Sequence, residues 1–216
     1  MTGVDQSFRG WGPVEAPRSM EDRERLAASF DLMEAALRGT RPPGMLALVV
    51  ERARLLAHVP LALVALPDAD GHTLRIEFTA GADGDRVRGS TVRLGRSMLG
   101  RVFSSRRALS ARVAADPAPG GLPGGLPGGL PAGPILILPL ETGEATRGVL
   151  AVLGRPGAQP FSPATAHRLL LFADMSARLI ELAEARRAAD AADSAPGDPH
   201  AVLAFPPSPM PGTRRP

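Results

Sequence analysis

Hydrophobic residues near the start of this chain recur at helical spacing. Leu26, Phe30, Met33 and Leu37 follow one another at intervals of four, three and four residues, which places them on one face of a helix. A second stripe of this kind covers about 44–58, and its apolar members are Leu46, Val49, Val50, Ala53, Leu56 and Ala57. The pattern therefore predicts two helices before any strand.

The next apolar segments have the character of strands. Residues 61–66 form a continuous apolar run, typical of a strand covered on both faces. Asp70-Gly71 is a strong turn signal, and residues 74–80 then alternate between apolar and polar side chains. Together they predict a hairpin. A second hairpin is predicted from the apolar runs 134–140 and 147–153.

Shorter elements are predicted between the two hairpins, and a long helix after them. A short helix over 97–104 is expected between short strands at 90–94 and 109–113. Ser162-Pro163 has the form of a helix start, and the predicted helix runs to about Arg187. This order predicts an α+β fold with a mostly antiparallel sheet of five to six strands, flanked by helices.

The domain organisation follows from where these patterns stop. Residues 1–18 and 189–216 lack periodicity and are expected to be disordered, the latter as a Pro-rich tail. The N-terminal helix occupies 19–40 and the domain proper 41–188. Within the domain, 114–133 is a Gly/Pro-rich loop with three Gly-Gly-Leu-Pro copies, which is either a lid over a ligand or a spacer without function.

Charge adds little to this picture. The formal net charge is +3 and the isoelectric point near 10.9 arises because all 25 basic residues are Arg. Tight basic clusters are confined to Arg106-Arg107, Arg186-Arg187 and Arg214-Arg215, and aromatic residues make up only 4%. We therefore expect no nucleic-acid partner. No apolar run approaches the length of a membrane span and no secretory signal is present, so a cytoplasmic protein without membrane contact is expected.

Catalytic and metal chemistry find little support in the residue types. The chain has no Cys, which excludes a thiolate nucleophile, a disulfide and a Cys-ligated metal. The four His, at positions 58, 72, 167 and 200, do not pair with another His or a carboxylate at metal-ligand spacing. We therefore expect no metal site, no catalytic residue and no enzyme activity.

The ordered set of segments resembles the GAF domain family. The hairpin Leu61–Ala80, the segment Leu94–Leu109, the pair Ile137–Leu140 with Gly148–Leu153, and Phe161-Ser-Pro163 before the last helix match the family in order and spacing. The resemblance covers about 42–188 and is closest to GAF domains of actinobacterial sensor kinases. It implies a sensory or interaction module whose N- and C-terminal helices pack together.

The resemblance also allows the family's cofactors to be tested against this chain. Haem-binding relatives use an axial His in the loop that corresponds to 114–133, which here contains none. Bilin-binding relatives use Cys, or His and Tyr, and this chain has neither Cys nor Tyr. The cyclic-nucleotide pattern is also incomplete, since Phe161 remains but Thr165-Ala166 replace the acidic pair. No cofactor is therefore expected.

The resemblance places a ligand pocket on one sheet face under the variable loop. The residues expected to line it are Leu63, Ala65, Phe78, Ser97, Phe103, Ile137 and Pro139. A closed core without a vacancy explains the same residues. A ligand of this lining would be a small apolar or aromatic molecule, and Arg96 and Arg101 are candidates to meet an acid group on it.

The apolar stripes of the terminal helices need partners of their own. We expect a homodimer through Leu26, Phe30, Met33, Leu37, Phe172, Met175 and Leu179, with a fold-back of the first helix onto its own sheet as the alternative. These expectations leave two alternative functions. One is a stand-alone sensory domain that binds a small molecule and signals to a separate protein. The other is a ligand-free dimerisation or interaction module.

Overall fold

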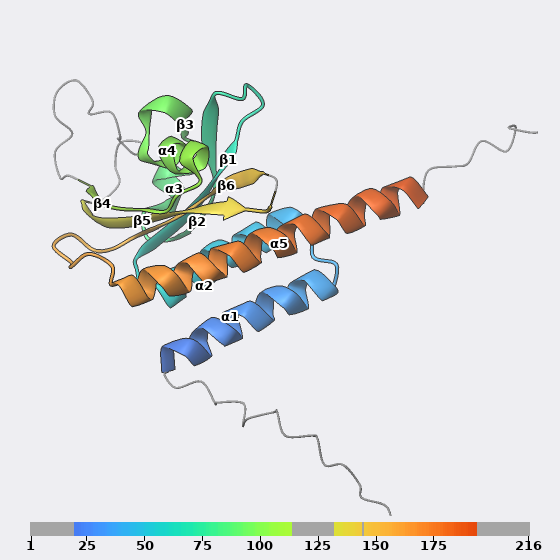
Figure 1. The fold of residues 1–216 in the computed structure, drawn as a ribbon, viewed down its shortest axis with the longest axis horizontal. Coiled ribbons are helices and arrows are strands. Elements are labelled where there is room, and N and C mark those ends of the chain that lie inside the picture. The colour runs from blue at the N-terminus through green and yellow to red at the C-terminus, as the bar shows by residue number, and fades with distance from the viewer. Residues whose placement is uncertain (1–19, 114–131, 144, 194–216) are drawn as a thin grey trace, which may run out of the picture.

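The computed structural model describes residues 20–113, 132–143 and 145–193. Its centre is a six-stranded antiparallel sheet with the strand order β3-β2-β1-β6-β5-β4 (Figure 1). The strands are β1 (Leu61–Pro67), β2 (Thr73–Gly81), β3 (Thr91–Arg93), β4 (Leu109–Val113), β5 (Gly133–Glu141) and β6 (Thr146–Leu153). β3 and β4 are therefore the two edge strands.

Helices cover both faces of this sheet. On one face lie α2 (Pro42–Leu56) and α5 (Pro163–Asp193), with α1 (Met20–Leu37) as an outer layer (Figure 1). On the other face lie α3 (Gly84–Val87), the 3₁₀ turn η1 (Leu94–Arg96) and α4 (Met98–Ser105). The chain thus crosses from edge strand β3 to edge strand β4 by way of α4.

Two hydrophobic clusters, one on each face, hold the layers together. Successive strand residues point to opposite faces, so Ala62 and Val64 of β1 join the α1/α2/α5 side and Leu61 and Leu63 join the α4 side. We call these the helix-side cluster and the α4-side cluster. Because the central strands are covered on both faces, their continuous apolar runs are explained.

The structure confirms the α+β class, the six strands and the packing of the terminal helices. Two boundaries differ from expectation. Pro42 and Pro43 lie inside the first turn of α2, where their missing N–H groups cost no hydrogen bond. α5 continues to Asp193, past the predicted end near Arg187, since its last turns are rich in the strong helix former Ala. The predictions for 1–18, 114–131 and 194–216 lie outside the described residues.

Candidate functional site

Four of the seven predicted lining residues share the sheet face beneath α4. Leu63, Ala65 and Ile137 belong to the α4-side cluster, and Pro139 pairs with Val149 of the same cluster. Phe103, on α4, packs against this cluster while remaining half-buried. The fold therefore brings these five residues together, as the prediction of a shared face required.

This face is tightly filled. Leu63, Ala65 and Ile137 have no accessible surface, and neither does Leu99, which α4 inserts above them. A void large enough for a water molecule would give its lining some accessible surface. The described residues thus form a closed core here, and a ligand would enter only if α4 moved.

Phe78 was predicted for this face and lies on the other one. Val64 pairs with Phe78 but Ala65 pairs with Ile76, so Glu77 is an extra residue that forms a β-bulge in β2. The bulge reverses the alternation beyond it. Leu74 and Ile76 therefore join the α4-side cluster, whereas Phe78 packs against the helix-side cluster.

Ser97 has a structural role that accounts for its burial. As the N-cap of α4, its Oγ accepts a hydrogen bond from the backbone N–H of Gly100 at 2.9 Å and donates one to the carbonyl of Arg93 at 2.8 Å. The Ser97 hydroxyl therefore already acts as both a donor and an acceptor within the chain. Ser97 positions α4 over the sheet.

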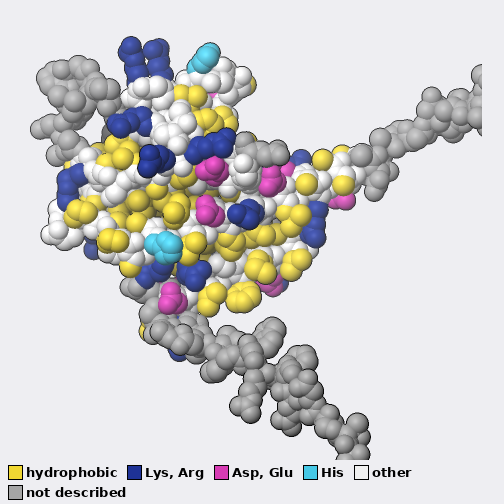
Figure 2. Space-filling view, in the orientation of Figure 1, with side chains coloured by type: hydrophobic (Ala, Val, Ile, Leu, Met, Phe, Trp, Pro, Cys, Tyr) yellow, Lys and Arg dark blue, Asp and Glu magenta, His cyan; other side chains and the backbone are white. Residues whose placement is uncertain are grey.

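The predicted dimer stripe of α1 is exposed. The side chains of Leu26, Phe30, Met33 and Leu37 are 37%, 63%, 43% and 72% exposed. Figure 2 shows hydrophobic side chains gathered over this part of the molecule. The opposite face of α1 is buried against α2 and α5, through Ala28, Leu32 and Ala36. The helix therefore folds back onto α2 and α5, not directly onto the sheet as the alternative expected, and still exposes the stripe.

The α5 part of the predicted dimer stripe is wrong in one position. Phe172 is fully buried in the helix-side cluster, because α5 lies on β5 with its Leu169/Phe172/Ala173 side. Met175 and Leu179 are half-buried against the same cluster. They offer a partner only part of their surface.

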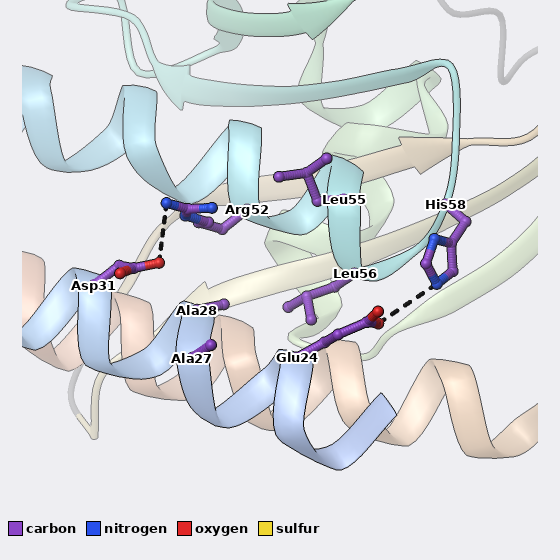
Figure 3. A pocket seen from close by; sticks show the side chains of 8 residues that line it. All are labelled: Glu24, Ala27, Ala28, Asp31, Arg52, Leu55, Leu56 and His58. Carbon is purple, nitrogen blue, oxygen red and sulfur yellow. Dashed lines mark ion pairs between the residues drawn. The ribbon is translucent and has the colours of Figure 1, made fainter. Parts of the chain in front are cut away.

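A hollow of about 320 Å³ separates α1 from α2. Figure 3 shows an ion pair at each end of it, Arg52 with Asp31 at 3.0 Å and His58 with Glu24 at 3.5 Å. Its walls are apolar, with Ala27, Ala28, Leu55 and Leu56 between the pairs. The two ion pairs fix the outer edge of α1 to α2.

A second hollow, of about 440 Å³, lies where β6 meets α5. Arg147 of β6 crosses its rim and binds two carboxylates of α5, Glu181 at 3.0 Å and Glu184. The Thr146 Oγ1 and Arg147 Nε atoms are buried and have no hydrogen-bond partner in the described part of the chain. These ion pairs tie the second half of α5 to the sheet.

Charge pairing perturbs few titratable groups. The side-chain hydrogen bond from Arg54 holds the pKa of Glu51 below its usual value, and the same bond raises the pKa of Arg54. In the β1–β2 turn, the backbone N–H of His72 donates to Asp70 and lowers the pKa of its carboxyl. None of these groups lies at the face beneath α4.

Within the described ranges, no group of three or more His, Cys, Asp or Glu is arranged to hold a metal ion. No helix among those residues is long and apolar enough to cross a bilayer.

Adjacent basic pairs in the sequence do not reveal one Arg-rich surface of the fold. Residues 86–113 contain eight Arg and no Asp or Glu, although only Arg106 and Arg107 are neighbours. A count of charge over a window of this length, in place of adjacent pairs, would have found it.

Comparison with known proteins agrees with this architecture. The family model for the GAF domain matches residues 40–181. The GAF-B domain of DevS from Mycobacterium smegmatis has a TM-score of 0.57 at 29% identity, over 68% of this chain and 98% of that one.

Two more distant structures share the fold alone. The GAF domain of a phosphoenolpyruvate-protein phosphotransferase from Coxiella burnetii has a TM-score of 0.61 at 16% identity, over 79% of this chain and 99% of that one. The free methionine-R-sulfoxide reductase from Neisseria meningitidis has a TM-score of 0.60 at 15% identity, over 79% and 96%. The fold, the strand order and the matched two thirds of the sequence lead to one conclusion: this chain belongs to the GAF domain family.

Proposed function

We propose that this chain is a regulatory GAF module that forms a homodimer through the exposed stripe of α1 and signals to a separate protein through its helical layer. The observation that carries the proposal is the stripe itself. Four large apolar side chains remain exposed on a helix whose other face is firmly docked. Contiguous exposed apolar surface of this kind marks interaction sites.

A second copy of the chain is the partner that this stripe fits. Its spacing of four, three and four residues is that of a coiled-coil seam. In a two-fold dimer the same patch faces itself, so one apolar stripe is complementary to another without further design. Burial of Phe30 and Leu37 in such a seam would remove their large exposed apolar area from water.

The helical layer is also connected to the sheet. α5 packs on β5, on α1 and on α2, and Arg147 of β6 pairs with Glu181 and Glu184. A rearrangement in the sheet would therefore be transmitted to α5 and then to α1. This gives the module a route from a sensed event to its dimer interface.

The test is the mass of the protein in solution. Phe30→Glu combined with Leu37→Glu places charges in the seam, and light scattering should report a monomer in place of the wild-type dimer. Leu171→Glu, at an exposed Leu of α5 outside the stripe, is the control and should leave the dimer intact. A monomeric wild type, or a double variant that is still dimeric, would refute the proposal.

A second candidate is small-molecule sensing at the face beneath α4. GAF domains generally serve sensory or regulatory roles with small ligands. The observation that favours it here is that one eight-residue helix closes a separate apolar cluster, so a modest movement of α4 would open a pocket. Such a pocket would take an apolar or aromatic molecule.

Native mass spectrometry tests this second candidate. A bound molecule should appear as added mass on the gently purified protein, disappear on denaturation, and be reduced when Phe103→Arg changes the half-buried side chain that α4 places against this cluster. Added mass that persists in that variant would place the ligand elsewhere.

A further inference from the structure

The segment 86–113 is strongly positive, although the whole chain is nearly neutral. It carries eight Arg and no acidic residue. Because the whole chain has a net charge of only +3 and this segment contributes +8, the remaining residues together carry −5. The excess positive charge is thus concentrated in this segment, whereas acidic residues outnumber Arg in the rest of the chain.

The fold places the helical parts of this segment on one side of the molecule. Its α3, η1 and α4 parts lie on the side of the sheet opposite α1, α2 and α5, and its β3 and β4 parts form the two edges of the sheet. Figure 2 shows Arg side chains gathered at the α4 end of the molecule, above the sheet. We call this surface the arginine face.

Half of these Arg are already paired. Arg86 binds Asp83 at 3.1 Å and Arg106 binds Glu141 at 3.3 Å, while Arg88 and Arg112 donate to the carbonyls of Glu77 and Ala158.

The other half are available to a partner. All of them are exposed, and none has an ion pair or side-chain hydrogen bond with another described residue. They are Arg93, Arg96, Arg101 and Arg107. Arg93 follows Val92 of the α4-side cluster in β3 and therefore points to the other face of the sheet. The remaining three, Arg96, Arg101 and Arg107, lie in or next to η1 and α4, and their free guanidinium donors form an anion-attracting surface.

Apolar side chains lie between these Arg. Leu94, Met98 and Phe103 are only half-buried and pack with their inner sides against the α4-side cluster. The arginine face therefore offers apolar contact as well as charge. A phosphate backbone has no apolar group to match it, whereas an acidic protein segment with apolar side chains matches both.

The face also offers little surface on which bases could stack. Its described residues present a single, half-buried aromatic ring, Phe103. Proteins that bind single-stranded nucleic acid stack the bases on aromatic side chains. The composition of the face thus favours a protein partner.

We propose that the arginine face binds an acidic amphipathic segment of a separate protein, with its carboxylates on Arg96, Arg101 and Arg107 and its apolar side chains on Leu94, Met98 and Phe103. Guanidinium groups bind carboxylates through two parallel hydrogen bonds, which gives such a contact direction as well as charge. This surface lies across the sheet from α1, so the proposal does not depend on the dimer.

The probe for the test is a synthetic helical peptide of about 18 residues, five turns, with Glu on one face and Leu on the other. Two comparison probes separate the sources of affinity: the same peptide with Ser in place of Leu, and a short DNA duplex. Fluorescence anisotropy with the full chain should show the Glu/Leu peptide bound most tightly. Its affinity should fall as salt rises, because exposed charge pairs are screened.

Substitutions in the chain then test whether the peptide binds at the arginine face. Arg96→Gln, Arg101→Gln and Arg107→Gln combined should weaken the peptide by at least about tenfold with an unchanged melting temperature, since these side chains make no bonds within the described chain. The matched control changes three exposed Arg outside the face, Arg155, Arg178 and Arg187, to Gln and should bind as wild type does.

Three results would overturn the proposal. They are equal loss in the control variant, DNA bound as tightly as the Glu/Leu peptide, or no peptide binding by the wild-type chain. A change in oligomeric state would bear on the α1 dimer only, so the failure of one proposal is distinguishable from failure of the other.

Discussion

Single polar side chains hold the irregular parts of this fold. Ser97 caps α4, and Asp70 closes the β1–β2 turn by accepting bonds from the N–H groups of His72 and Thr73 at 2.8 and 3.0 Å. Gly71 follows with φ of 66°, a left-handed conformation that Gly adopts without strain. In both places the oxygen of a short side chain accepts hydrogen bonds from backbone N–H groups.

Ser97→Ala should destabilise the protein by about 1 kcal/mol, because the buried N–H of Gly100 loses its acceptor. The free energy of unfolding in urea measures this. Ser97→Gly should cost less, since Gly is a tolerable N-cap. Equal stability of Ser97→Ala and wild type would show that the cap contributes nothing.

Asp70 should make stability depend on pH. Its hydrogen bonds lower the pKa of the folded-state carboxyl below the unfolded value, so their contribution is complete above the unfolded pKa and is lost as the pH falls through the folded pKa. The melting temperature of Asp70→Ala should therefore lie below that of wild type at neutral pH, and the difference should narrow in acid. A difference that is constant with pH would contradict this.

At the scale of an element, the contribution of a helix to stability depends on the side chains of its buried face. α1 buries the small side chains of Ala28 and Ala36 around Leu32, and exposes its larger ones. Leu32→Ala should destabilise the chain by about 2 to 5 kcal/mol if α1 is part of the folding unit. Leu171→Ala, at an exposed position, should change stability by less than about 0.5 kcal/mol. Urea unfolding compares the two, and similar values would mean that α1 docks weakly.

The sequence predicts most elements of this fold and fails where alternation is interrupted. Regular apolar spacing was enough for α1, for both hairpins and for the capped helix α4. The face of Phe78 was not predictable, because a bulge changes pairing without a change in composition. For α1, the stripe of large apolar residues is exposed, and the intramolecular contact is made by Leu32 with the small Ala28 and Ala36. This narrower buried face carries a weaker signal in the sequence.

The candidate site was predicted less completely for a related reason. Strand parity placed Leu63 with Ala65 and Ile137 with Pro139, and the resemblance to GAF domains placed the two pairs on one face. Whether that face holds a cavity depends on how closely α4 packs, which spacing does not encode. The arginine face arises from residues spread over three kinds of element, so only the fold brings them to one side.

At the scale of the whole molecule, self-association should couple stability to concentration. A dimer that dissociates on unfolding is stabilised by mass action. The melting temperature of the wild type should therefore rise with protein concentration, and that of the Phe30→Glu, Leu37→Glu variant should not. A melting temperature independent of concentration in both proteins would contradict the α1 dimer.

The bulge at Glu77 has a consequence for chain length. Removing one residue from a strand usually turns every later side chain inside out, but here Glu77 is the residue that interrupts alternation. Without it, Ile76 and Phe78 would become neighbours and would keep the opposite orientations they have now. β2 should therefore tolerate deletion of Glu77 and reject deletion of Thr79. Insertions and deletions are commonly assigned to loops, whereas the extra residue of this molecule lies within a strand of its sheet.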